Sequence, residues 1–306
     1  MTPVILGFDT SNYKTSIAVF SPSDQTYRLE GRLLNVPAGA LGLRQNEALF
    51  QHVRHLPLLA ERLLDGAPVL AVGYSDRPRA VEGSYMPCFL AGESAARTVA
   101  AAFGVPCRAS SHQEGHLASA AFSCGRFDLM GQEFLAWHLS GGTTEFLHVY
   151  PDLRTKIIGG TEDISAGQLI DRTGVLLGLR FPAGPDVERL ALSSDNGDFF
   201  SVKIKQGFFS LSGMENQVKS RIGVGLPAPE ICRFSLLTIA DVILRCTRTM
   251  QEELNLPVLV SGGVSVNRLL QKAMACETNV YFAQNGLGGD NALGTALLTA
   301  RKENLL

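Results

Sequence analysis

Three short turns of small and polar residues, each directly after an apolar strand, constrain the fold of this chain more than any other feature. They cover residues 9–12, 140–144 and 260–264. An apolar segment returns after the first two turns, which predicts hairpins, whereas the third opens a helix. Paired glycines after a strand let the backbone approach a ligand closely and turn its amides towards an anion. Each turn alone could also be only a tight turn, and Asp9 could merely start the first one, but together the three turns indicate a nucleotide or phosphate site.

The two hairpins divide the chain into similar halves. Strand-then-helix units follow each hairpin, and no low-complexity linker separates the halves. We therefore expect an α/β protein with two lobes that face each other across a cleft. Lobe I is expected at 1–127, with a C-terminal helix at 288–306 that packs back on it, and lobe II at 128–287. The order of the turns is similar to that of the actin, Hsp70 and sugar-kinase superfamily.

The apolar periodicity predicts most of the helices. Pro57 is expected to break the first of them or to start a second helix. The polar segment 191–225 has no clear period and is expected to be irregular. The expected helices cover 41–64, 91–103, 164–177, 234–254, 266–275 and 291–301, with a further helix after Ser111.

Composition excludes several classes of protein. Hydrophobic residues make up 45% of the 306 residues and charged residues 18%, which excludes a disordered chain. The chain has 27 basic and 29 acidic residues, so its net charge does not attract RNA. RNA would have to bind to a local basic patch or to a partner protein. No apolar run reaches the roughly 18 residues of a membrane span, and no basic segment precedes Asp9 as in a signal peptide. We expect a cytoplasmic protein with no membrane contact, whose six scattered cysteines are buried, reduced thiols.

A histidine pair suggests a metal site. His112 and His116 are four residues apart, so on a helix both imidazoles lie on one face. This spacing suits two ligands of one metal, with a third ligand from elsewhere in the chain, but such a pair can also bind nothing. In zinc proteases of the HExxH type a glutamate directly follows the first histidine, whereas here Glu114 is the second residue after it. The sequence therefore argues against a metallopeptidase.

These residues resemble a known family, the TsaD family. His112–His116 (HQEGH) is similar to its HMEGH signature. Further matches keep the order of the family and span roughly residues 5 to 296. They are 139–143 with VSGGH, 163–184 with DDAAGEAFDK…LLGL.YPGG, 209–213 with FSFSG, 261–267 with AGGVSAN, and 290–291 with the closing TDN.

The resemblance implies a reaction, ligands and partners. The reaction is transfer of threonylcarbamoyl from threonylcarbamoyl-AMP to N6 of adenosine 37 in tRNA. It implies iron or zinc held by His112, His116 and Asp290. Asp171 would meet the ribose hydroxyls, and Gly262 and Gly263 would lie at the adenosine side. The complete implied adenylate set is Leu139, Ser140, Gly141, Gly142, Thr143, Asp171, Gly184, Gly262, Gly263 and Asn267.

Partners follow from the same resemblance. Helix 41–64 matches the place where the family pairs with a noncatalytic, TsaB-like partner of similar fold. Its apolar positions fit equally well inside this chain's own lobe. A homodimer is a further alternative to the TsaB-like partner.

The chain also departs from the family at acidic positions. Tyr13 and Lys14 replace the acid pair of the first hairpin, Thr143 replaces a histidine, and Gln168 replaces a glutamate. Two alternatives therefore stay open beside the transferase: a regulatory paralogue that binds ATP or ADP without transfer, and a small-molecule kinase or carbamoyltransferase of the same superfamily. The kinase or carbamoyltransferase alternative is favoured by Asp9 and Thr15, the two catalytic candidates, because the hairpin that carries them could hold magnesium and phosphate.

Overall fold

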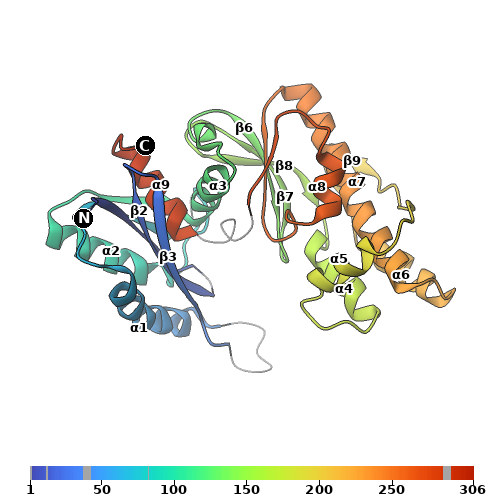
Figure 1. Cartoon of the computed structure of the whole chain (residues 1–306), viewed down its shortest axis with the longest axis horizontal. Coiled ribbons are helices and arrows are strands. Elements are labelled where there is room, and N and C mark those ends of the chain that lie inside the picture. The colour runs from blue at the N-terminus through green and yellow to red at the C-terminus, as the bar shows by residue number, and fades with distance from the viewer. Residues whose placement is uncertain (1, 12, 37–42, 82, 285–290) are drawn as a thin grey trace. The chain divides into compact units, whose positions relative to one another are not determined.

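The computed structural model describes residues 2–11, 13–36, 43–81, 83–284 and 291–306. The chain forms two compact units (Figure 1). Unit 1 consists of Met1–Phe122 and Gly286–Leu306, and unit 2 of Ser123–Asn285. Each unit has its own mixed sheet, which confirms the expected two-lobed α/β class. The interlobe cleft stays a prediction.

Unit 1 is built on a five-stranded sheet in the order β3-β2-β1-β4-β5. The expected first hairpin is present, because β1 and β2 pair antiparallel, and β3 extends it. β4 and β5 then continue the sheet parallel to β1. The strands are β1 (Val4–Asp9), β2 (Lys14–Ser21), β3 (Thr26–Leu33), β4 (Val69–Arg77) and β5 (Cys107–Ser111).

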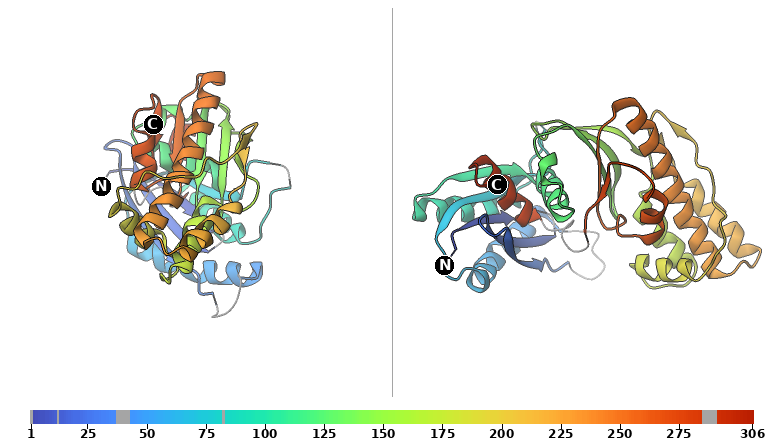
Figure 2. Two further views of the ribbon diagram at one scale, coloured as in Figure 1. Left: turned by 90° about the vertical axis from the view of Figure 1, so that its right-hand side faces the viewer. Right: turned by 45° about the horizontal axis from the view of Figure 1, so that its top comes forward.

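A pair of glycines brings the last helix close to this sheet. Gly7 of β1 and Gly73 of β4 are neighbours in register. A Cβ at Gly7 would lie 2.0 Å from the Ala292 carbonyl oxygen, and one at Gly73 would lie 2.1 Å from Thr299 Oγ1. Helix α9 (Asn291–Lys302) therefore lies directly on the strands, and Figure 2 shows it there from two further sides. The other helices of unit 1 are α1 (Gln45–Leu63), α2 (Phe89–Phe103) and α3 (His112–Ser123).

The expectation that Pro57 breaks the first helix is wrong. Helix α1 runs without interruption past Pro57. Proline removes the hydrogen bond to the carbonyl four residues earlier, which here is that of Val53. Pro57 and Val53 both lie on the exposed face of α1, so solvent can satisfy that carbonyl.

Unit 2 is built on a seven-stranded sheet in the order β12-β11-β6-β7-β8-β10-β9. Trp137 of β6 lies fully buried in its core, stacks on Phe146 with the ring centroids 4.3 Å apart, and donates its Nε1 hydrogen to Thr247 Oγ1 at 2.9 Å. The strands are β6 (Phe134–Leu139), β7 (Thr144–Val149), β8 (Thr155–Thr161), β9 (Ile204–Lys205), β10 (Phe208–Phe209), β11 (Val258–Ser261) and β12 (Val280–Phe282). The helices are α4 (Ala166–Leu176), α5 (Gly184–Leu192), α6 (Gly213–Gly223), α7 (Ala228–Leu254) and α8 (Arg268–Met274), with a 3-10 turn at Phe127–Leu129.

Three further expectations can be compared with the structure. Segment 191–225 is not irregular throughout, because it contains β9, β10 and α6. None of the six cysteines forms a disulfide, as expected, but Cys276 is exposed and only three of them are buried. Within the described ranges, no helix combines the length and the apolar character that crossing a membrane requires.

Candidate functional site

The second and third turns lie side by side because the strands that precede them are neighbours. β6 and β11 are adjacent and parallel, so both strands end at the same edge of the sheet. The Val264 amide donates to the Leu139 carbonyl at 2.9 Å. Gly262 has a φ of +97°, and a Cβ there would lie 2.2 Å from the same carbonyl oxygen. The close approach of the turns therefore requires glycine at this position.

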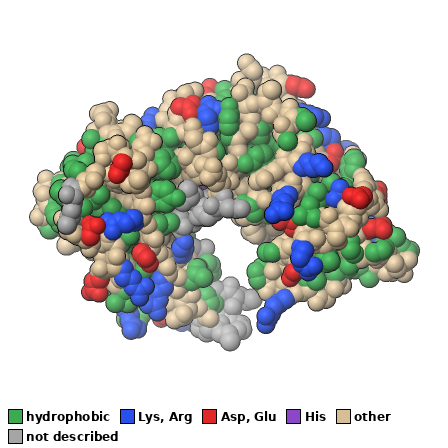
Figure 3. Space-filling model, in the orientation of Figure 1, with side chains coloured by type: hydrophobic (Ala, Val, Ile, Leu, Met, Phe, Trp, Pro, Cys, Tyr) green, Lys and Arg blue, Asp and Glu red, His purple; other side chains and the backbone are tan. Residues whose placement is uncertain are grey.

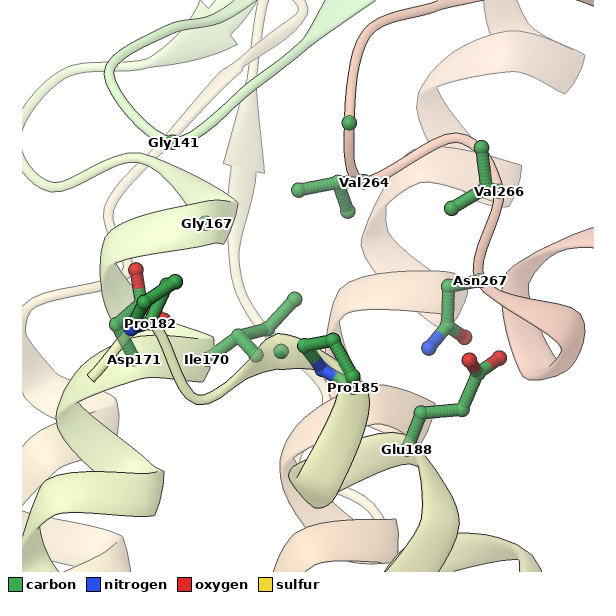
Figure 4. Close-up of a pocket in the computed structure, with 12 residues that line it drawn as sticks. Gly141, Gly167, Ile170, Asp171, Pro182, Pro185, Glu188, Val264, Val266 and Asn267 are labelled. Carbon is green, nitrogen blue, oxygen red and sulfur yellow. The ribbon is translucent and has the colours of Figure 1, made fainter. Parts of the chain in front are cut away.

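A pocket of about 260 Å³ opens between these turns and helices α4 and α5 (Figure 4). It gathers five of the ten predicted adenylate residues from segments far apart in the sequence. These five are Gly141, Asp171, Gly184, Gly263 and Asn267. A Cβ built at any of the three glycines would meet no atom within 4 Å, so their missing side chains leave open space.

Polar side chains lie on opposite sides of this pocket in Figure 4. Asp171 accepts a hydrogen bond from the Ala183 amide at 2.7 Å through Oδ1, and no described residue engages its Oδ2. On the other side, Asn267 caps α8, because its Oδ1 accepts from two backbone amides of that helix, each at 3.1 Å. Glu188 lies beside it and accepts from the Arg268 amide at 2.6 Å. Sequence reasoning missed Glu188, although it follows Gly184 by one turn of α5.

The remaining predicted adenylate residues do not line the pocket. Leu139 is buried, and Gly262 holds the two turns together. Ser140 and Thr143 close their own turn, since the Thr143 amide donates to Ser140 Oγ at 3.0 Å and the Ser140 amide to the Thr143 carbonyl at 2.8 Å. Gly142 sits at the exposed tip between them. Their contact with a nucleotide stays a prediction.

Gln168, which replaces a glutamate of the family, has a structural role. The Gln168 amide donates to Ser165 Oγ at 3.0 Å, and Gln168 Oε1 accepts from the Ser165 amide at 3.3 Å. This reciprocal pair is a capping box, which glutamine and glutamate complete equally well. The start of α4 beside the pocket is therefore fixed despite the replacement.

The histidine pair of unit 1 converges as its spacing predicts. α3 begins at His112, and Nε2 of His112 and Nε2 of His116 lie 2.9 and 3.1 Å from Asn291 Nδ2. Asn291 Nδ2 also contacts His112 Nδ1. The helices that carry these residues touch at glycines, because a Cβ at Gly294 would lie 1.9 Å from the Gly115 carbonyl oxygen.

The third predicted metal ligand, Asp290, lies outside the described residues. Within the described residues no group of three or more His, Cys, Asp or Glu side chains could hold a metal ion. The donor set nevertheless fits one. Two imidazole nitrogens lie within 3.1 Å of one atom, Asn291 Nδ2, and the buried Oδ1 of Asn291 beside them has no hydrogen-bond partner among the described residues.

Asp9 lies behind His112, buried at the end of β1. Its Oδ2 lies 2.9 Å from His112 Nδ1 and accepts from the Ser75 hydroxyl at 2.6 Å, and its Oδ1 accepts from the Ser11 amide at 2.9 Å. Burial alone would raise the pKa of Asp9, but the His112 imidazole and these hydrogen bonds hold it well below its usual range. Asp9 therefore starts a turn and also contacts the predicted metal site.

The hydroxyl of Thr15, the second catalytic candidate, is buried between two histidines. Thr15 Oγ1 lies 2.8 Å from His52 Nδ1 and 3.2 Å from His55 Nδ1. Both histidines come from α1 and are buried. Sequence reasoning did not place them beside Thr15, because their approach to β2 depends on the packing of α1. A catalytic role for Thr15 stays a prediction.

The sequence is similar to known proteins of one family. The family model TsaD, described as tRNA N6-adenosine threonylcarbamoyltransferase, matches residues 48–297. A protein of that name from Thermus thermophilus is 31% identical over 97% of this chain and 92% of its own length. Proteins of the same name from Streptococcus pneumoniae and Prochlorococcus marinus are 30% and 29% identical, over 94% and 96% of this chain and 89% of their own lengths.

Solved structures share the fold at low sequence identity. Full-length HypF in a phosphate- and nucleotide-bound form matches 98% of this chain and 55% of its own, with a TM-score of 0.63 and 14% identity. A component of (R)-2-hydroxyglutaryl-CoA dehydratase from Acidaminococcus fermentans matches 99% of this chain and all of its own, with a TM-score of 0.56 and 15% identity. A glucokinase of the ROK family from Streptomyces griseus matches 97% of this chain and 99% of its own, with a TM-score of 0.53 and 13% identity. These likenesses confirm the two-lobed α/β fold that the order of the turns predicted.

Proposed function

Because the chain belongs to the TsaD family of tRNA N6-adenosine threonylcarbamoyltransferases, we propose that it transfers threonylcarbamoyl from threonylcarbamoyl-AMP to N6 of an adenosine in tRNA. Membership in this family makes the chain a transferase related to tRNA-modifying enzymes. The acyl group, the adenylate, the metal and the partner are the proposal. The partner would be a protein of similar fold or a second copy of this chain.

The observation that carries this proposal is the pocket of unit 2. Its open glycines leave room for backbone to approach a phosphate, as the family's adenylate requires. Asp171 Oδ2, which no described residue engages, could accept from ribose hydroxyls, and Glu188 offers a second carboxylate on the opposite side. The chain thus offers small residues for a phosphate and acceptors for a sugar in one cavity.

The histidine pair would hold the metal, iron or zinc, together with Asp290. When bound, the metal supplies Lewis-acid polarisation of the carbamoyl carbonyl and a template for its orientation. His112 and His116 would contribute imidazole nitrogens, which lie 2.9 and 3.1 Å from Asn291 Nδ2. Asn291 lies between them, where its amide can hydrogen-bond to a group held there.

The pocket is tested by filling it. Gly263→Val places a branched side chain in the pocket at a position where nothing lies within 4 Å, so the fold should tolerate it. We expect the affinity for AMP or ADP, measured by calorimetry, to fall about tenfold or more. Gly197→Val is the matched control, because Gly197 is equally open and lies outside the pocket. Equal affinity of both variants and wild type would remove the pocket as the adenylate site.

The metal is tested separately by elemental analysis. We expect about one metal per chain for wild type and a substoichiometric content for His112→Ala. His148→Ala is a control, because His148 lies in unit 2 on β7 and contacts Glu133. If the wild-type protein contains no metal after it has been loaded with iron or zinc, this part of the proposal is contradicted.

The replaced acids of the first hairpin favour one competing function. Tyr13 is 39% exposed, and it and Lys14 stand where the family has acidic residues. A regulatory paralogue would bind nucleotide and metal and form no modified nucleoside. Binding without transfer would therefore support this alternative.

A further inference from the structure

We propose that Asp9 is a positioning residue: its buried carboxylate holds His112 with the proton on Nδ1, so that Nε2 is presented as a metal ligand. This inference rests on the proposed function, because it concerns the metal site that the histidine pair would form. It gives Asp9 a role different from that of a phosphate-binding hairpin acid.

The carboxylate of Asp9 is held rigidly. It is 2% exposed, and it makes hydrogen bonds to three segments: the turn after β1 through Ser11, strand β4 through Ser75, and the start of α3 through His112. A carboxylate fixed from three directions can fix its partner in turn. Rotation of the His112 ring would break its contact with Asp9 and leave the buried carboxylate with one hydrogen-bond donor fewer.

The tautomer of His112 follows from the chemistry of its partner. An ionised carboxylate has only acceptors, so the hydrogen shared between Asp9 Oδ2 and His112 Nδ1 must come from the histidine. A neutral imidazole with its proton on Nδ1 carries a lone pair on Nε2. Nε2 of His112 and Nε2 of His116 lie 2.9 and 3.1 Å from the same amide nitrogen of Asn291, which also contacts His112 Nδ1. The centroids of the two imidazole rings are 4.5 Å apart, so the Nε2 atom whose lone pair Asp9 sets lies beside the second imidazole.

The same carboxylate is linked to the helix that supplies Asn291. Ser75 Oγ, which donates to Asp9, lies 3.3 Å from Thr295 Oγ1. Thr295 Oγ1 in turn donates to the Asn291 carbonyl at 2.9 Å. β4, α9 and α3 thus meet in one buried network around Asp9, so the carboxylate also couples the placement of Asn291 to that of His112.

Asp9→Asn tests the role of the charge while keeping the shape of the side chain. We expect 10–100-fold weaker binding of Zn²⁺, measured by competition with a chromophoric chelator, because supporting carboxylates of metal-bound histidines contribute about that much. The visible absorption of bound Co²⁺ should also change, since it reports ligand orientation. Ser75→Ala, which loosens the carboxylate without removing it, should give a smaller loss.

Asp76→Asn is the matched control. Asp76 is the residue after Ser75, pairs with Arg77 and does not contact the histidines, so its replacement should leave the affinity for Zn²⁺ unchanged. If wild type and Asp9→Asn both bind Zn²⁺ and do so with equal affinity, the inference is overturned and the proposed metal site stays intact. Absence of Zn²⁺ binding by wild type would instead contradict the proposed function.

A second measurement observes the wild-type protein directly and needs no metal. Nitrogen-15 NMR of histidine-labelled wild type distinguishes a protonated Nδ1 from a protonated Nε2, and His112→Gln identifies the signal. We expect His112 to carry its proton on Nδ1 in the metal-free protein. A proton on Nε2 alone would overturn the inference.

Discussion

At the residue scale, the most unusual feature is a buried hydroxyl between two histidines. Thr15 Oγ1 contacts both His52 and His55 in the core of unit 1. Burial lowers the pKa of His52 to about 4, although the negative charge of Asp9 opposes that shift. The pKa of His55 is lowered in the same direction, by burial first and then by Arg32 and Arg54. Both rings are therefore neutral in the folded protein at neutral pH.

This arrangement makes stability depend on pH in a definite direction. The pKa of His52 is about 4 in the folded chain and about 6.5 in the unfolded chain, so its contribution is complete above pH 6.5 and is lost as the pH falls towards 4. Between pH 7 and pH 5 the free energy of unfolding should decrease on the order of 1 kcal/mol more for wild type than for His52→Gln. Thermal unfolding at the two pH values measures this difference. Parallel pH dependences of the two proteins would show that His52 is not protected from protonation.

A second residue joins two segments of unit 2. Asp163, just before α4, accepts hydrogen bonds from the Leu211 amide at 2.8 Å, from the Ser212 amide at 3.1 Å and from the Ser210 hydroxyl. Burial alone would raise the pKa of Asp163, but the hydrogen bonds from Ser210, Ser212 and Leu211 hold it far below its usual range. Asp163 thus anchors the start of α6 beside α4.

Asp163→Asn should destabilise unit 2 by about 2 kcal/mol, because an amide nitrogen would face donors that the carboxylate now accepts. Differential scanning calorimetry should show a lower unfolding temperature. Asp152→Asn is the control, since Asp152 pairs only with Arg154 in an exposed turn, and it should change stability by less than about 0.5 kcal/mol. A similar effect of both substitutions would contradict the anchoring role.

At the scale of elements, the contact between α3 and α9 decides whether the histidine pair meets Asn291. The helices touch at Gly294, where a Cβ would lie 1.9 Å from the Gly115 carbonyl oxygen. Gly294→Ala should therefore push the helices apart, destabilise unit 1 by about 1–3 kcal/mol and weaken the binding of Zn²⁺.

Chelator competition and thermal unfolding on the same sample measure both effects of Gly294→Ala. Gly197→Ala is the control, because a Cβ there meets nothing within 4 Å. Unchanged Zn²⁺ affinity in a destabilised Gly294→Ala protein would show that the helix contact does not shape the histidine site.

Elements with local signals could be predicted from the sequence, and those that depend on packing could not. The hairpins after Asp9 and Ser140 follow from their turn residues, and the convergence of His112 and His116 follows from helical spacing. Strand β3 escaped prediction because it lies at the edge of its sheet and is largely exposed, so it lacks an apolar run. Glu188 and the two histidines around Thr15 gain their positions only when distant helices pack.

At the scale of the whole molecule, a net charge of −2 leaves RNA no general attraction. Lys and Arg side chains gather in the region of α1 on unit 1 (Figure 3). Arg32 and Arg54 line a pocket of about 450 Å³ there, and neither guanidinium has a carboxylate partner among the described residues. Such cations are suited to phosphate contacts.

The double substitution Arg32→Ala with Arg54→Ala should weaken tRNA binding and reduce the slope of log K against log salt by about 1–2. Fluorescence anisotropy across a salt series measures both quantities. Arg97→Ala is a control, because Arg97 is already paired with Glu93. An unchanged slope in the double variant would exclude these arginines from the RNA contact.

The most direct test of the proposed activity is mass spectrometry of nucleosides from tRNA incubated with threonylcarbamoyl-AMP, the metal-loaded chain and the partner proteins of its own source. We expect N6-threonylcarbamoyladenosine with wild type and none with His112→Ala plus His116→Ala. The Thermus thermophilus relative, assayed alongside, establishes that the substrates are competent. No modified nucleoside from this chain, in a reaction where the relative forms it, would contradict the assignment.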